Sequence, residues 1–130
     1  MYRCLTVSVS IQRLPAHVYA FVSNGDNLAR WLTFCTSVRR SRDEWVLDTP
    51  VGEMRFRFVP ANELGVLDHH VTLPDGQEVL NPMRVVPNGA GSEVVFTLFQ
   101  LSGMSEEKFA EDVGMVKRDL AGLKAVLEGV

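Results

Sequence analysis

The chain has 130 residues and a formal net charge of −3, with 46% hydrophobic and 22% charged residues. This length and composition are typical of one globular domain, so we treat residues 1–130 as a single domain. The acidic balance argues against a nucleic-acid-binding surface, because the only basic cluster, Arg39, Arg40 and Arg42, is far shorter than such a surface needs.

The two cysteines, Cys4 and Cys35, are far apart and provide neither a CxxC motif nor the spacing of zinc ligands. Residues 1–12 alternate polar and apolar side chains and lack the continuous apolar segment of a signal peptide. No apolar run approaches the roughly 20 residues that span a bilayer. We therefore expect a cytoplasmic protein with reduced thiols and no stable membrane insertion.

The first predicted element is a strand, because apolar and polar side chains alternate over residues 5–12. Pro15 suits the first turn of a short helix that continues over residues 17–22. The sequence Asn-Gly-Asp at 24–26 ends that helix, and residues 27–31 predict a second one.

A meander of strands follows, at 34–40, 45–49, 54–59, 66–73, 78–86 and 93–101. The clearest alternation places Met54, Phe56 and Phe58 between Arg55 and Arg57. It predicts one apolar face toward the core and one cationic face toward solvent.

Residues 105–128 predict a long amphipathic helix with Ser105 as its N-cap. Its apolar residues recur at steps of three or four and form one stripe: Phe109, Val113, Val116, Leu120, Leu123 and Leu127. Gly114 interrupts this helix, and we interpret it as a site of close packing, with room for a ligand as the alternative.

The seven predicted strands and the long helix segregate along the chain, which indicates an α+β fold with an antiparallel sheet. We expect a curved seven-stranded sheet wrapped around the C-terminal helix, with two short helices after the first strand.

The turns predict how the strands pair. Residues 73–77, Leu-Pro-Asp-Gly-Gln, suit a three-residue hairpin loop. This loop places His69 opposite Asn81 and Leu67 opposite Met83.

The second loop, at residues 88–91, predicts Met83 opposite Phe96 and Asn81 opposite Leu98. Both loops direct the same side chains to one inner face, which supports the pairing. That face is broader than one helix, so either side chains or a ligand must fill the remaining space.

Three polar residues, His69, Asn81 and Gln100, fall on this mostly apolar face. A buried polar group without a partner costs roughly 1–3 kcal/mol, so each must contact another residue, water or a ligand. A simple cross-strand pair between His69 and Asn81 is one alternative, and contact with a ligand is the other.

We predict no metal site and no cofactor. His69 and His70 are neighbours on a strand and point to opposite faces, so they do not share one ion. Cys35 is interpreted as a buried structural thiol. Asp112 and Asp119 could reach the edge of the cavity, but we expect them to form ion pairs with Lys108 or Lys117 on the helix surface.

Catalysis remains an alternative hypothesis, with His69 as general acid or base, because imidazole exchanges protons near neutrality. Asn81 would then orient His69 or bind a developing enolate oxygen. This arrangement suits proton transfer beside a carbonyl, as in cyclisation or dehydration.

Several segments in order resemble the SRPBCC superfamily, which includes START-type lipid-binding domains, birch-pollen-allergen-like proteins and the polyketide cyclase/dehydrase group. They are PAHVY at 15–19, NLARW at 27–31, GVLDH at 65–69, PMRVVPNG at 82–89 and SEVVFTL at 92–98, followed by the long final helix. The resemblance covers essentially the whole chain. It implies a helix-grip fold with a deep hydrophobic cavity, but it does not imply one activity.

From the inner face and this resemblance we expect a small hydrophobic ligand, lipid- or polyketide-like, between the sheet and the C-terminal helix. The predicted ligand-binding residues are Trp31, Phe34, Trp45, Phe56, Phe58, Leu67, His69, Asn81, Met83, Phe96, Leu98, Gln100, Phe109, Val113 and Val116. The resemblance matches Trp31 to an aromatic residue near the cavity mouth; helix packing is its alternative role. We expect a monomer or homodimer.

Two other functions stay open. One is an enzyme of the same fold, a polyketide cyclase, aromatase or dehydratase that acts as a lyase or isomerase. The other is a protein-interaction or regulatory module.

Overall fold

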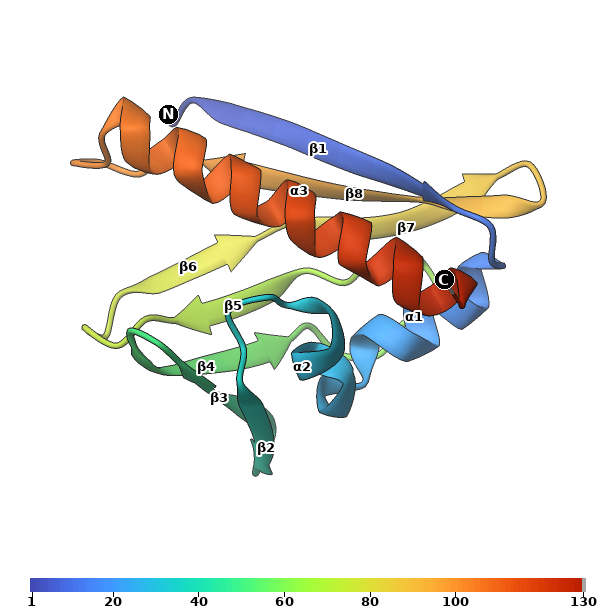
Figure 1. Cartoon of the computed structure of the whole chain (residues 1–130), viewed down its shortest axis with the longest axis horizontal. Helices are drawn as coiled ribbons and strands as arrows, with labels where there is room; N and C mark the ends of the chain where they lie inside the picture. The colour runs from blue at the N-terminus through green and yellow to red at the C-terminus, as the bar shows by residue number, and fades with distance from the viewer. Residues whose placement is uncertain (130) are drawn as a thin grey trace.

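A computed structural model describes residues 1–129 of the chain. The elements are β1 (Cys4–Ile11), α1 (Pro15–Ser23), η1 (Gly25–Asn27), α2 (Leu28–Trp31), β2 (Ser37–Ser41), β3 (Glu44–Thr49), β4 (Gly52–Phe58), β5 (His69–Thr72), β6 (Glu78–Asn81), β7 (Met83–Asn88), β8 (Gly91–Phe99) and α3 (Glu106–Glu128). This order confirms the α+β class, the short helices after the first strand and the long final helix (Figure 1).

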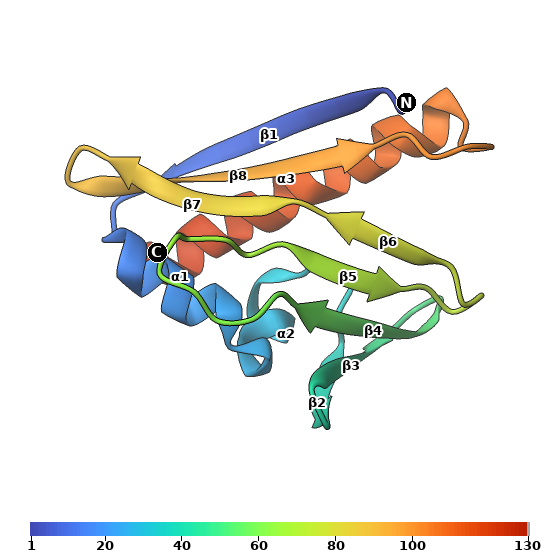
Figure 2. The same ribbon diagram turned by 180° about the vertical axis from the view of Figure 1, so that it is seen from behind.

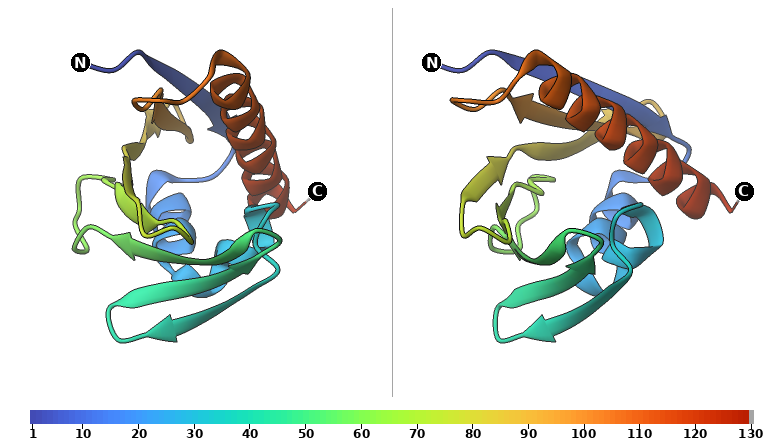
Figure 3. Two further views of the ribbon diagram at one scale, coloured as in Figure 1. Left: turned by 90° about the vertical axis from the view of Figure 1, so that its left-hand side faces the viewer. Right: turned by 60° about the vertical axis from the view of Figure 1, so that its left-hand side comes forward.

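The strands form two antiparallel sheets, with the orders β1-β8-β7 and β2-β3-β4-β5-β6. Figure 2 shows both sheets from behind, with α3 running across their far side. The two sheets curve around one side of α3, and α1 and α2 lie at the end of the molecule where α3 finishes (Figure 3). The helix is therefore gripped by the strands, as expected from the sequence.

Pro82 divides the strand that we expected over residues 78–86. It has no N–H for a ladder, and β6 ends just before it while β7 begins just after it. The Pro82 carbonyl still accepts a hydrogen bond from Thr97 N at 3.0 Å. The structure therefore has eight strands instead of seven, and the predicted pairing of Asn81 with Leu98 is wrong.

The pairing predicted from the first hairpin loop is confirmed. His69 lies opposite Asn81, and Leu73 N donates to Gln77 O at 2.8 Å across the turn. Gly76 adopts φ +90°, the left-handed conformation that this turn needs. Beyond β7, Met83 lies opposite Phe96, as the second loop predicted.

The long helix begins as predicted, because the Ser105 hydroxyl accepts a hydrogen bond from Lys108 N. Phe109, Leu120 and Leu123 of its apolar stripe are buried against the strands. Burial of an apolar side chain of this size contributes roughly 1.5–3 kcal/mol, so this face holds α3 against the sheets.

Asp119 lies elsewhere than we predicted. It is only 3% exposed, and its Oδ1 accepts hydrogen bonds from Thr33 N at 3.0 Å and Thr33 Oγ1 at 2.9 Å. Asp119 thus ties α3 to the segment after α2, and its expected ion pair with Lys117 is wrong. The predicted pair between Asp112 and Lys108 is confirmed at 3.0 Å.

Gly25 and Gly114 have contrasting surroundings. A Cβ on Gly25 would lie 2.1 Å from the Trp45 ring, so Trp45 packs directly on this backbone. A Cβ on Gly114 would meet only Arg118 of the same helix, at 3.7 Å. The close packing that we expected at Gly114 is therefore wrong.

Gly114→Ala should raise the free energy of unfolding by up to about 1 kcal/mol, because alanine has the higher helix propensity and its methyl group meets open space. Gly25→Ala should lower it, since the Trp45 ring must move. Chemical denaturation of both variants checks this pair, and a destabilised Gly114→Ala variant would contradict the open surroundings of Gly114.

Candidate functional site

His69 lies on β5 inside a box of aromatic rings. Its imidazole stacks on Phe56, with ring centroids 4.8 Å apart and planes inclined by 20°. The rings of Phe58 and Phe96 lie at 5.6 Å and 5.7 Å. Only 2% of His69 is exposed, so β4, β5 and β8 together enclose a histidine within an apolar surrounding.

The hydrogen bonding of His69 fixes its tautomer. Nδ1 lies 3.0 Å from Leu67 O, and a carbonyl oxygen can only accept, so Nδ1 carries the proton and donates. In the neutral ring, Nε2 then presents a lone pair. Leu67 O is the hydrogen-bond partner of the ring within residues 1–129, and Nε2 is not among the fully buried polar atoms that lack a partner.

Burial lowers the pKa of His69 from 6.5 to about 4, so the ring is neutral near pH 7. A group with this pKa is a poor proton donor and a weak base at neutrality. The site therefore offers a fixed hydrogen-bond acceptor rather than a proton shuttle.

Asp68 holds His69 in place across the break at Pro82, a role that we did not predict. Its Oδ1 accepts from Met83 N at 2.8 Å, and Arg84 binds both carboxylate oxygens, at 3.0 Å and 2.9 Å. The hydrogen bond from Arg84 lowers the pKa of Asp68. The bridge was missed, although the predicted pairing of Leu67 with Met83 already brings Asp68 and Arg84 together on the outer face.

The other polar candidates are arranged differently. Asn81 is half-buried opposite His69, but among residues 1–129 the two side chains share no hydrogen bond. Gln100 Nε2 donates to Met104 O at 3.0 Å and contacts Glu106 Oε1 at 3.2 Å. The amide of Gln100 thus supports the turn into α3.

The apolar candidates come together in one packed cluster. The candidates that are buried in this cluster are Trp31, Phe56, Leu67, Met83, Phe96, Leu98 and Phe109. Its partly exposed members are Phe34, Trp45, Phe58, Val113 and Val116. Phe34 lies in the segment between α2 and β2, outside the strand that we expected for it.

Trp31 carries an unpaired donor. The side chain is 4% exposed, and its indole Nε1 is buried without a hydrogen-bond partner among the described residues. Leaving such a donor unsatisfied costs roughly 1–3 kcal/mol. Trp31 Nε1 is thus the one fully buried side-chain polar atom without a partner within residues 1–129.

Two surface hollows lie apart from these residues. One, of about 440 Å³, lies between β1 and α3. The other, of about 390 Å³, lies between α1 and the loop around residues 62–65. Neither hollow is lined by any of the predicted ligand-binding residues.

No group of three potential metal ligands occurs within residues 1–129. Cys35 is buried, as expected, and its thiol donates to Ser37 O at 3.4 Å. Burial raises the pKa of Cys35, which keeps it protonated. No helix in the described part of the chain is both long and apolar enough to cross a bilayer.

The buried histidine should make stability depend on pH. The unfolded chain binds a proton at His69 near pH 6.5, whereas the folded protein resists this until about pH 4. The contribution of neutral His69 to the free energy of unfolding is therefore complete above pH 6.5. It is lost as the pH falls from 6.5 to about 4, and the loss is about 3 kcal/mol at most.

Denaturation curves at several pH values should show that the free energy of unfolding falls less with decreasing pH for His69→Phe than for the natural protein. The exposed His17→Gln variant should keep the natural profile. Coincident profiles for the natural protein and His69→Phe would contradict a buried neutral imidazole.

Comparisons with known proteins agree with this architecture. A family described as polyketide cyclase / dehydrase and lipid transport matches residues 3–128. No curated protein sequence matches the chain significantly.

Solved structures share the fold at low sequence identity. XoxI from Bacillus cereus has a TM-score of 0.77 at 18% identity, covering 95% of this chain and 94% of its own. Ara h 8.0201 has a TM-score of 0.74 at 11% identity, covering 100% of both chains. Aha1 from Colwellia psychrerythraea, solved as a dimer, has a TM-score of 0.77 at 15% identity, covering 97% of this chain and 96% of its own. The chain therefore belongs to the polyketide cyclase/dehydrase and lipid-transport family of the SRPBCC superfamily.

Proposed function

We propose that this protein binds a small, mostly apolar molecule between α3 and the inner faces of the sheets, and that a donor group of the molecule bonds to His69 Nε2. The observation that carries this proposal is a neutral, 2% exposed imidazole with a free acceptor inside an aromatic box. Buried polar groups without protein partners are typical of sites that complete their hydrogen bonds with a ligand.

The partly exposed apolar residues support a ligand of this kind. Phe34, Phe58, Val113 and Val116 pack against the core and still keep accessible surface. An apolar molecule that covered them would gain roughly 25 cal/mol for each Å² removed from water. A lipid- or polyketide-like molecule has the required apolar body.

The free N–H of Trp31 supports a ligand that also carries an acceptor. A carbonyl or ether oxygen would relieve the cost of this unsatisfied donor. Hydroxyl and carbonyl groups on a ring system would thus complement His69 and Trp31 together.

Binding is favoured over acid–base catalysis for two reasons. A pKa of about 4 makes His69 ineffective as an acid or base near neutrality. Asn81 also does not hydrogen-bond to His69 within the described structure, so the orienting contact of the catalytic hypothesis is missing. We place the binding function in the cytoplasm, which the free thiols of Cys4 and Cys35 support.

Matched naphthalene probes test this proposal by titration calorimetry. 2-Naphthol offers a hydroxyl donor and 2-methoxynaphthalene does not. The natural protein should prefer 2-naphthol by about five- to tenfold, since one net hydrogen bond contributes about 1 kcal/mol.

His69→Phe should keep the aromatic box, bind both probes and lose the preference. His70→Phe is the matched control, because His70 lies on the opposite face of the strand and contacts Glu78. The proposal fails if neither probe saturates the natural protein, or if His69→Phe retains the full preference for 2-naphthol.

A further inference from the structure

β1 is an edge strand with one side of its backbone free. It pairs with β8 alone, and Gln100 N donates to Arg3 O at 2.8 Å in the same ladder. Backbone groups alternate in direction along a strand, so the odd-numbered residues of β1 bond to β8. The N–H and C=O groups of Thr6 and Ser8 therefore point away from the sheet.

One end of this edge is closed by α3. Lys124 Nζ donates to Ser10 O at 2.7 Å, and Gln12 N donates to Glu128 Oε2 at 2.7 Å. Lys124 and Glu128 also pair with each other at 2.9 Å. Side chains of α3 thus occupy the edge from Ser10 onward, whereas the stretch from Cys4 to Ser8 has no such cover within residues 1–129.

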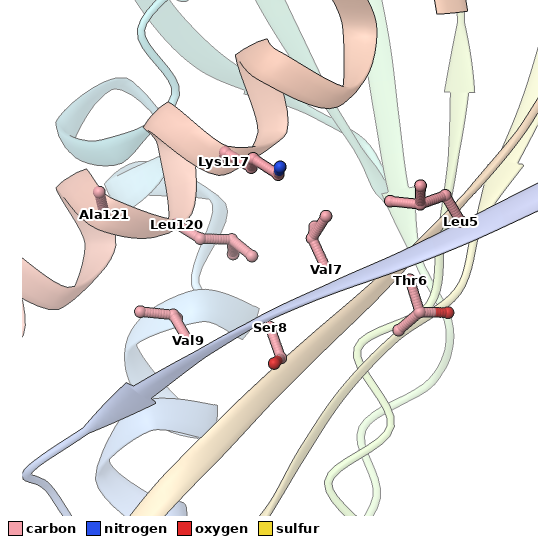
Figure 4. A pocket seen from close by; sticks show the side chains of 8 residues that line it. All are labelled: Leu5, Thr6, Val7, Ser8, Val9, Lys117, Leu120 and Ala121. Atoms are coloured by element: carbon pink, nitrogen blue, oxygen red, sulfur yellow. The ribbon is translucent and has the colours of Figure 1, made fainter. Parts of the chain in front are cut away.

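A hollow of about 440 Å³ runs beside the open stretch, between β1 and α3. Figure 4 shows Leu5, Val7 and Val9 turned toward α3, where Leu120 and Lys117 complete the lining. The hollow thus combines an apolar floor, an unpaired strand edge and one cation. Lys117 forms no ion pair with any described residue.

We propose that the Cys4–Ser8 stretch of β1 accepts an extended, acidic segment of a partner protein as an added strand. The backbone of the partner would bond to the free groups of Thr6 and Ser8. Apolar side chains at every second position would enter the hollow, and a carboxylate on that same face, two residues from an apolar one, would face Lys117. Strand addition of this kind combines main-chain hydrogen bonds for affinity with side-chain pockets for specificity.

Charge decides between this partner and a second copy of the chain. Residues 3–13 contain Arg3 and Arg13 and no acidic residue. A second β1 on the same edge would therefore bring only positive charge toward Lys117. An acidic segment supplies the missing counter-charge.

A short fluorescein-labelled peptide with valine, glutamate and valine at every second position, and threonine between them, tests the proposal by fluorescence anisotropy with the full chain. The natural protein should bind it saturably. Lys117→Gln should weaken binding about two- to fivefold, as the loss of an exposed ion pair allows. Lys117→Glu should weaken it further. Arg118→Gln is the matched control, because it removes the neighbouring cation and should leave affinity unchanged.

N-methylation of the peptide tests strand pairing without altering the protein. Methyl groups on the amides of the peptide edge that pairs with β1 should abolish binding. Methyl groups on the amides of the opposite edge should not. The proposal would be overturned if the protein bound both methylated peptides equally well. It would also be overturned if Lys117→Glu bound the unmethylated peptide as tightly as the natural protein does, or if the natural protein showed no saturable binding. Sedimentation would overturn it as well if it showed that the free chain dimerises through this edge and that Thr6→Pro makes it monomeric.

Discussion

One helix, α3, has to cover the inner faces of two sheets, and this mismatch in width determines much of the molecule. The sheets curve toward the helix, and α1 and α2 close the end where α3 finishes (Figure 3). Asp119 reaches Thr33 and ties the helix to that end. Apolar residues toward the rest of the face, such as Phe34 and Val116, remain only partly covered. A hollow of about 440 Å³ also lies along β1, between this strand and the helix.

The two polar groups of the proposed binding site are of opposite kind. Leu67 O holds the proton of His69 on Nδ1, burial keeps the ring neutral, and Nε2 remains an acceptor. Trp31 contributes the donor. The buried N–H of Trp31 costs free energy while it stays unpaired, so a ligand that offers it an acceptor gains affinity from a cost that the fold already carries.

Much of the fold was predictable from local patterns. The alternation in β4 and the turn at Pro74–Gly76 predicted which residues face inward, because turn chemistry and a period of two are local properties. That pairing placed His69 on the inner face, but it did not predict that Phe56 and Phe58 of β4 and Phe96 of β8 surround the ring. The sequence itself marks the division at Pro82, which lacks an N–H, and the predicted hairpin pairing already brings Asp68 near Arg84. The burial of Asp119 and the low pKa of His69 depend on distant segments meeting, which no local pattern encodes.

The central claim is that the interior binds an apolar molecule that hydrogen-bonds to His69. Native mass spectrometry of the natural protein and of His69→Phe, each purified from the host of the protein, tests it most directly. The account predicts a bound small molecule on the natural protein and lower occupancy on His69→Phe. A clean unliganded mass for the natural protein, or equal occupancy of both proteins, would contradict it.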